Sequence, residues 1–294
     1  MSFLDISSSL LIGQFLLGII NGSFYAILSI GLALIFGMLR VINFAHGALY
    51  MLGAFVAWTL SQSFGIGFWW ALILSPFIVA LLALVFERTM LSKVYAEEHV
   101  SGLLLTLGFG MLIEGTVRYY FGNSLRQYPA PAVLQGVIDL GIMVVPKYRA
   151  FVLGASLSIC LLVWVLIERT RLGAYLRAAT ENPILVKVFG INVPRMMALT
   201  YAAGGALAAF AGVIGAPIYQ VSPLMGHDLI IIIFAIVVIG GIGSILGSVI
   251  TSLILGIAEA MTKVFYPEAA STVVFLIMAL TILVRPYGLF GREA

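Results

Sequence analysis

Few residues of this 294-residue sequence have the types and spacing needed for covalent catalysis. Ser222 and His227 are one candidate pair, because a serine hydroxyl becomes a good nucleophile beside a histidine base. Both lie in the short stretch 217–228 between apolar segments, where Asp228 is the one residue that could orient the histidine. A pair with so little support does not indicate an enzyme, and we expect no catalytic residues.

Metal, nucleotide and nucleic-acid chemistry have even less support. His46 has no second histidine or cysteine at the spacing of a metal site, and the single cysteine, Cys160, lies inside an apolar run. The sequence lacks the GxxxxGK[ST] loop that cradles nucleotide phosphates. A net charge of +3 over this length provides no basic face. We therefore predict no metal site, no cofactor bound by this chain and no nucleic-acid partner.

Two pairs of oppositely charged residues stand four apart in apolar segments. Glu114 and Arg118 can meet on one helix face, and we expect a structural ion pair there rather than a substrate contact. Glu259 lies deeper in its segment, where Lys263 could pair with it. A packing role and a functional role for Glu259 both stay open.

Several uncharged or weakly basic polar residues interrupt the apolar stretches and are our candidates for lining a solute pathway. They are Asn21, Ser23, Tyr25, Asn43, His46 and Thr106. Polar groups without partners are costly in hydrocarbon, so these side chains should face protein or a translocation route. For His46, a hydrogen bond at a helix end is the main expectation and pathway lining is the alternative.

A glycine cluster is the last pathway candidate. It contains Gly240, Gly241, Gly243 and Gly247. Close helix packing explains these glycines, and so does a helix break that exposes backbone groups to a polar solute. The stretch 240–244 and the stretch 43–47 each interrupt an apolar run, which suggests a possible inverted repeat.

The composition identifies the elements that must carry these residues. The chain is 62% apolar and 9% charged, whereas a soluble domain has about 25% charged residues. A membrane-spanning helix needs about 20 apolar residues. Nine apolar segments are present, at 10–39, 46–61, 65–86, 102–121, 150–168, 196–216, 229–243, 245–265 and 271–284. We predict an all-α integral membrane protein with about eight membrane-spanning helices (eight to ten), in a single domain, 1–294. Segment 10–39 is either one long helix or two short ones.

The loop 169–195 contains the densest cluster of lysine and arginine, which places it in the cytoplasm. Alternation along the chain then puts the C-terminus on the same side. Residues 173–181 favour a helix, Asn182-Pro183 should end it and start another, and Gly190 should end the second. Two short helices would form a compact knob for docking a partner. The alternative is a basic loop that only sets topology.

Several motifs together resemble one transporter family in order, spacing and total length. They are Gly-x-x-Tyr-Ala (22–26), Ile-Asn-Phe-Ala-His-Gly (42–47), Arg-Ala-x-x-Glu-Asn (177–182) with Gly-Ile-Asn (190–192), Leu-Ala-Ala-Phe-Ala-Gly-Val (207–213), Gly-Gly-Ile-Gly-Ser-Ile-Leu-Gly-Ser (240–248), Gly-Ile-Ala-Glu (256–259) and Arg-Pro-Tyr-Gly-Leu-Phe-Gly (285–291). The sequence resembles branched-chain amino acid ABC transporter permeases, specifically the H-type subunit of the Liv system.

The resemblance implies an ABC importer permease fold in the bacterial inner membrane, and transport of leucine, isoleucine and valine. It implies a second, M-type permease, two ATPase subunits that bind ATP and Mg, and a periplasmic solute-binding protein. It also implies that the knob couples to the ATPases. The coupling residues would be Arg177, Ala178, Ala179, Glu181, Asn182 and Gly190.

Other functions stay open within and outside this family. Related permeases carry urea, short amides or aromatic acids, and the sequence does not select among these substrates. An ion-coupled secondary transporter would use intramembrane acids as relays, and we identify only Glu114 and Glu259 for that role.

Overall fold

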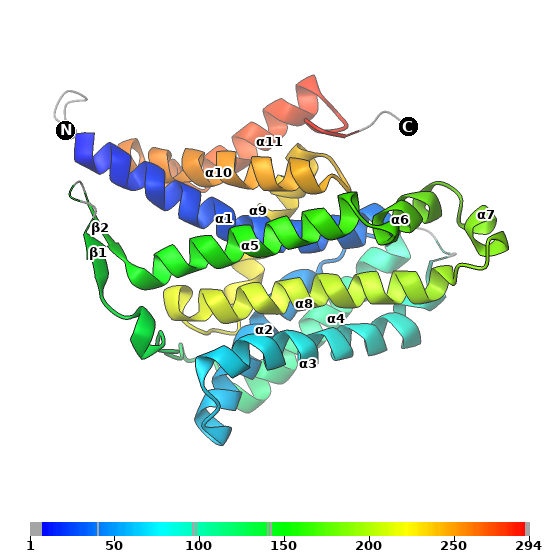
Figure 1. The fold of residues 1–294 in the computed structure, drawn as a ribbon, viewed down its shortest axis with the longest axis horizontal. Coiled ribbons are helices and arrows are strands. Elements are labelled where there is room, and N and C mark those ends of the chain that lie inside the picture. The colour runs from blue at the N-terminus through cyan, green and yellow to red at the C-terminus, as the bar shows by residue number, and fades with distance from the viewer. Residues whose placement is uncertain are drawn as a thin grey trace.

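The structure is a computed structural model that describes residues 8–39, 41–95, 97, 99–139, 141 and 143–291, and it is a bundle of helices (Figure 1). Each of the nine apolar segments forms one helix, which confirms the expected all-α membrane fold. These helices are α1 (Ser8–Leu39), α2 (Ala45–Phe64), α3 (Phe68–Thr89), α4 (His99–Phe121), α5 (Lys147–Glu168), α8 (Val193–Tyr219), α9 (Met225–Gly240), α10 (Ile245–Phe265) and α11 (Thr272–Val284).

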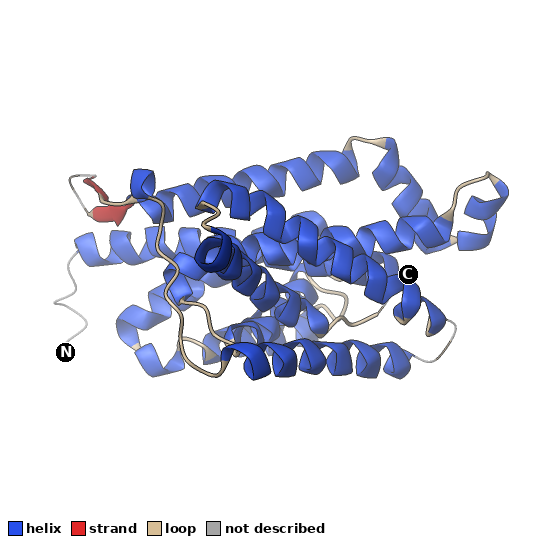
Figure 2. Cartoon of the chain, turned by 90° about the horizontal axis from the view of Figure 1, so that it is seen from below, coloured by secondary structure: helices blue, strands red, loops and turns tan. Residues whose placement is uncertain are grey.

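Short elements connect the long helices. They are α6 (Arg171–Glu181), α7 (Pro183–Val188), the 3-10 turns Leu91–Lys93, Ala132–Leu134 and Pro267–Ala269, and the strands β1 (Val137–Asp139) and β2 (Val144–Pro146). The strands form an antiparallel hairpin with Ile138 opposite Val145. The hairpin lies at the same end of the bundle as the start of α1, while α6 and α7 lie at the opposite end (Figures 1 and 2).

The long helices differ in their ability to cross a bilayer. Within the described ranges, six are long and apolar enough to do so: α1, α3, α4, α5, α8 and α10. The helices α9 and α11 have 16 and 13 residues, so at about 1.5 Å per residue they fall short of a hydrocarbon core of about 30 Å. Segment 10–39, for which one or two helices were expected, is the single 32-residue helix α1.

The two halves of the chain are arranged as an inverted repeat. In Figure 1, α1 and α3 run from left to right, whereas α8 and α10 run from right to left. Packing follows the same symmetry, because α1 lies along α10 as α8 lies along α3. Likewise α2 contacts α3 and α4 as α9 contacts α10 and α11. The halves α1–α4 and α8–α11 therefore have matching helix packing and opposite direction.

The repeat pairs different interruptions from those expected. The sequence suggested pairing 43–47 with 240–244, but the counterpart of the break before α2 is 220–224, the break before α9. The two helices that follow these breaks meet backbone to backbone at Gly47 and Gly226, where a side chain on either glycine would overlap the other's carbonyl oxygen. Both α2 and α9 therefore begin in the interior of the bundle.

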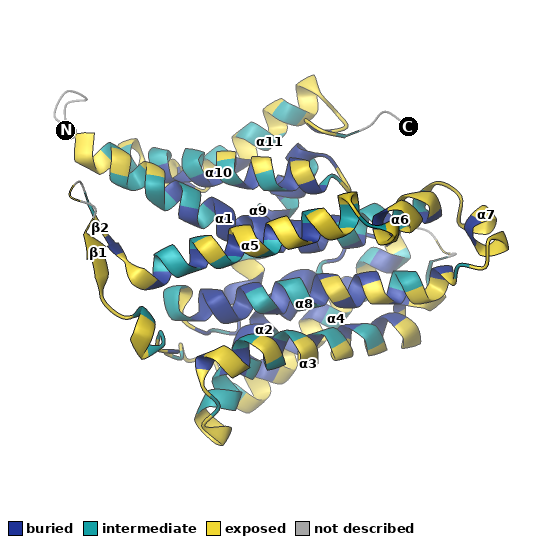
Figure 3. Cartoon of the chain, viewed as in Figure 1, coloured by how far each residue is buried: buried dark blue, intermediate teal, exposed yellow. Residues whose placement is uncertain are grey.

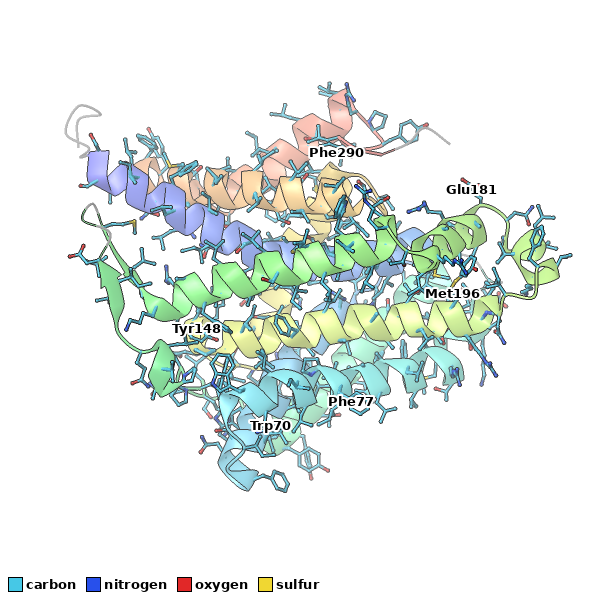
Figure 4. All side chains as sticks on the ribbon, viewed as in Figure 1. Trp70, Phe77, Tyr148, Glu181, Met196 and Phe290 are labelled. Atoms are coloured by element: carbon cyan, nitrogen blue, oxygen red, sulfur yellow. The ribbon has the colours of Figure 1, made fainter. Side chains whose placement is uncertain are left out.

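Burial identifies the centre of the bundle and its lipid-facing surfaces. The middle and C-terminal part of α1 is buried on all sides, while α3, α5 and α11 expose apolar side chains (Figure 3). Trp70 and Phe77 of α3 are 66% and 70% exposed and point outward from the bundle (Figure 4). Outward apolar side chains of this kind are what a lipid environment requires. The expected cytoplasmic C-terminus falls on residues 292–294, outside the described residues.

Candidate functional site

The loop between α5 and α8 forms the expected knob of two short helices, α6 and α7. Asn182 joins them: its backbone N–H donates to the Ala178 carbonyl oxygen at 2.9 Å, and its Oδ1 accepts from the Leu185 N–H at 3.1 Å. One residue therefore ends α6 and caps α7, as Asn before Pro183 predicted. Gly190 follows α7 with φ +79°, a left-handed conformation that glycine adopts without strain.

The knob is packed directly onto the spanning helices. Ala179 and Val186 form a small apolar cluster with Met38, at the end of α1, and with Val193, at the start of α8. Thr200 of α8 donates a hydrogen bond to the Met38 sulfur at 3.2 Å. Because interiors are close-packed, a displacement of α6 or α7 must move the ends of α1 and α8.

A second attachment joins the knob to α5. Arg177 Nη1 donates to the Ile167 carbonyl oxygen at 3.2 Å and lies 3.4 Å from Glu168 Oε2. Gly173 lies so close to the Ile167 carbonyl oxygen that a Cβ there would overlap it. Sequence reasoning missed Gly173, although a glycine near the start of a short helix is the signal that could have identified it.

The outer surface of the knob is apolar and hollowed. Val188 and Phe189 are 78% and 81% exposed at one end of the bundle, where Figure 1 shows α7 projecting away from the other helices. A groove of about 510 Å³ runs between the two helices. It is lined by Tyr175, Ala178, Glu181, Asn182, Leu185, Val186, Phe189 and Ile191. Of the expected coupling residues, Ala178, Glu181 and Asn182 therefore lie in this groove, whereas Arg177 and Ala179 face the spanning helices.

Three of the expected pathway residues, Asn43, His46 and Thr106, meet at the junction before α2, which comprises residues 41–44 and the first turn of that helix. Thr106 Oγ1 of α4 lies 3.0 Å from the Ile42 carbonyl oxygen and accepts from the Phe44 N–H at 3.3 Å. Asn43 Oδ1 accepts from the Tyr201 hydroxyl at 3.2 Å, and His46 Nε2 lies 3.0 Å from the Leu28 carbonyl oxygen. A carbonyl oxygen only accepts, so His46 Nε2 carries a hydrogen.

These contacts explain how non-helical backbone is tolerated inside an apolar bundle. The polar groups of such a segment must be satisfied by protein or by a water-filled cavity. Asn43 and His46 are each 1% exposed. Two of their atoms, Asn43 Nδ2 and His46 Nδ1, have no hydrogen-bond partner among the described residues. The junction is thus a small group of polar side chains in the bundle interior. Tyr201 belongs to this group, and the sequence analysis did not predict it.

The polar residues of α1 belong to a separate set of contacts. Tyr25 donates to Glu259 Oε2 at 3.0 Å, and Lys263 donates to Glu259 Oε1 at 2.7 Å. Ser23 bonds back to the Ile20 carbonyl oxygen of its own helix. Asn21 is half-buried on the same helix. Glu259 therefore has the expected Lys263 partner and a second one, Tyr25, while Glu114 pairs with Arg118 as expected.

The glycine cluster lies in tight backbone contacts. A Cβ on Gly240 would come within 2.7 Å of Gly247, and one on Gly243 within 3.0 Å of Gly37. The amide of Phe290 donates to the Gly240 carbonyl oxygen at 3.2 Å, so the C-terminal segment covers this turn. This turn therefore meets α1 at Gly37, whereas the polar groups at the junction before α2 bond to Leu28, Thr106 and Tyr201.

The residues considered for catalysis and metal binding are not organised into a site. Ser222 and His227 share no hydrogen bond within the described part of the chain, and Asp228 is exposed beside them. No group of three or more potential metal ligands occurs among the described residues.

Comparison with known proteins gives a consistent result. Residues 14–284 match the family described as branched-chain amino acid transport system, permease component. The chain is 31% identical to the high-affinity branched-chain amino acid transport system permease protein LivH of Escherichia coli K12, over 94% of each chain. It is 30% identical to the permease protein BraD of Pseudomonas aeruginosa over 95% of each, and 25% identical to LivM of E. coli K12 over 90% of this chain and 67% of LivM. This chain therefore belongs to the family of permease components of branched-chain amino acid transport systems.

Proposed function

We propose that this chain is the H-type membrane subunit of an ABC importer that moves leucine, isoleucine and valine into the cell. Similarity to LivH and BraD over nearly the whole chain is the observation that carries the proposal. Similarity to LivM supports a second permease of related fold as its partner in the membrane. Two ATPase subunits and a periplasmic binding protein complete the assembly, which lies in the bacterial inner membrane with the knob and the C-terminus in the cytoplasm.

The knob passes the movement driven by ATP hydrolysis from an ATPase subunit to the spanning helices. The groove between α6 and α7 is lined mainly by apolar side chains together with Glu181 and Asn182, so it suits a complementary surface on an ATPase subunit. Movement of that subunit displaces the knob, and the cluster of Ala179, Val186 and Met38 transfers the displacement to α1 and α8. Gly190 lets the chain turn sharply after α7, next to the exposed Phe189.

The pathway runs through the bundle near the polar residues. Asn43, His46 and Thr106 stabilise the break before α2, and Asn21, Ser23 and Tyr25 supply polar atoms along α1. The tight turn of Gly240, Gly241 and Gly243 fixes the position at which α9 and α10 meet α1. These residues make the bundle interior polar enough for an amino acid and leave its outer surface apolar.

Reconstitution tests the proposal. The chain, co-expressed with an M-type permease and two ATPases, should copurify with them, and liposomes containing the complex should accumulate leucine when ATP and binding protein are supplied. Competition with isoleucine and valine should be strong, while urea, short amides and aromatic acids should compete weakly. Complex assembled without this chain is the control.

Two results would contradict the proposal. Accumulation of amino acid by the chain alone would show that it needs no partner. Uptake that persists without ATP and collapses with the ion gradient would favour an ion-coupled secondary transporter.

A further inference from the structure

The first turn of α9 carries two ionisable residues with no role so far, His227 and Asp228. Both side chains are exposed, and neither is hydrogen-bonded or ion-paired to another described residue. The residues that precede them, Met225 and Gly226, are buried. The backbone at this point is therefore fixed inside the bundle while the two polar side chains reach its surface.

This turn lies deep within the thickness of the bundle. Gly226 packs on Gly47, and α2 begins beside Gly110, where a Cβ would come within 3.3 Å of the Ala45 Cα. Gly110 is the middle residue of the 23-residue helix α4. Each end of α4 is therefore about 16 Å away along that helix. His227 and Asp228 are thus far from both membrane interfaces.

Contact with lipid is a poor environment for such residues. Ionisable side chains at membrane depth are costly in hydrocarbon and normally face protein or a water-filled cavity. The exposed surface of the first half of α3, by contrast, is apolar, with Ile73 and Phe77. The exposed part of α9 is also short: Ile231 is exposed, but Ile233 and Ile236, which follow it in the helix, are buried.

The surroundings of the turn are polar as well. The first turn of α2 contacts Gly226 through Gly47 and contains the buried His46 Nδ1, and Asn43 Nδ2 is buried just before the helix; neither nitrogen has a partner among the described residues. Two breaks in the helical backbone, 41–44 and 220–224, thus adjoin the same contact. Non-helical backbone at membrane depth is typical of places where a transported solute binds.

We infer that His227 and Asp228 line a water-filled part of the transport route and that Asp228 binds the ammonium group of the amino acid in transit. The inference rests on the proposed function, because that function supplies a zwitterionic solute. A carboxylate without a protein partner is the natural counterpart of an ammonium group. His227, beside it, offers ring nitrogens that can hydrogen-bond the solute or water.

Cysteine labelling tests the position of this turn independently of the solute. Cys160 is buried in α5 and would be replaced by serine. Single cysteines would then be introduced as His227→Cys and, as the lipid-facing control, Phe77→Cys. The assembled complex in liposomes would be treated with a cationic (trimethylammonium) and an anionic (sulfonate) methanethiosulfonate in each nucleotide state.

The labelling should distinguish water from lipid and detect the charge of Asp228. The cysteine at 227 should react in at least one nucleotide state, and the one at 77 in none. The cationic reagent should be favoured about tenfold at position 227, because a nearby carboxylate concentrates cations. Adding Asp228→Asn should abolish this preference. Absence of reaction at 227 in every state, or a preference unaffected by Asp228→Asn, would overturn the inference.

Uptake tests the role of Asp228 in binding. At saturating binding protein, Asp228→Asn should lower leucine uptake about tenfold, since one partner of a charge pair is lost, and Asp228→Glu should restore most of it. Copurification with the partner subunits verifies that both variants assemble. Uptake unchanged in an assembled Asp228→Asn complex would overturn the ammonium contact. If the wild-type complex carried no branched-chain amino acid, the proposed function would fail. Labelling would still show whether position 227 is accessible to water, because it does not depend on the solute.

Discussion

The knob of α6 and α7 and the junction before α2 are both breaks in a helical chain, but different forces hold them. In the knob, Asn182 caps α7 through the Leu185 N–H three residues away, and Gly190 ends the turn. In the junction, Thr106, Tyr201 and Leu28 supply the partners, and they come from three different helices. The knob is therefore a locally encoded structure on the surface, whereas the junction exists only in the assembled bundle.

This difference predicts how each region responds to mutation. Changes in the junction should destabilise the whole bundle, because buried backbone groups lose their partners. Changes on the outer surface of the knob should leave the fold intact and alter function. Changes at the contact between the knob and α5 should also lower stability, as in the junction, because this contact is a close backbone contact.

Gly173→Ala should have the largest effect on stability. Its Cβ would overlap the Ile167 carbonyl oxygen, so α6 must move away from α5. We expect a loss of about 3 kcal/mol, at the upper end for overpacking, seen as a lower Tm of the detergent-purified chain. Gly154→Ala is the control, because a Cβ at Gly154 meets nothing within 4 Å. An equal Tm for the two variants would show that the knob is not fixed through this contact.

Thr106→Val should have the next largest effect. Valine keeps the shape but cannot hydrogen-bond the Ile42 carbonyl oxygen or the Phe44 N–H. Leaving buried groups unpaired costs about 1–3 kcal/mol. The matched control is Thr116→Val on the same helix, whose exposed hydroxyl donates to the Leu112 carbonyl oxygen of its own helix. Thermal unfolding should separate the two variants, and indistinguishable Tm values would refute a structural role for Thr106.

Asn182→Ala should affect stability least. Loss of an N-cap costs about 1 kcal/mol, and here the loss is confined to the six-residue helix α7. Hydrogen exchange should therefore increase at the amides of α7 with little change in the spanning helices. Asn182→Asp retains a cap acceptor and should behave like the wild type. Faster exchange throughout α1 and α8 would instead show that the knob helps to hold the bundle together.

The same contrast explains which features could be predicted from the sequence and which could not. Asn182-Pro183 and Gly190 are local signals, so both short helices and their ends were predicted correctly. The nine apolar segments likewise specified nine helices. The partner of Asn43, which is Tyr201, and the second partner of Glu259, which is Tyr25, are distant in sequence and leave no periodic signal. The pairing of 41–44 with 220–224 was missed for a similar reason, because the second break contains no cluster of glycines.

Coupling through the knob is the central claim, and Glu181→Lys tests it most directly. Glu181 lies in the exposed groove and forms no ion pair with another described residue, so its replacement should not disturb folding. ATPase rate and leucine uptake would be measured on assembled complexes in liposomes, with Glu268→Lys on the α10–α11 connection as the control. We expect normal assembly, uptake reduced about tenfold as for the loss of an interface charge, and ATPase activity that no longer responds to loaded binding protein. Unchanged uptake and a normal ATPase response in the assembled Glu181→Lys complex would contradict the account.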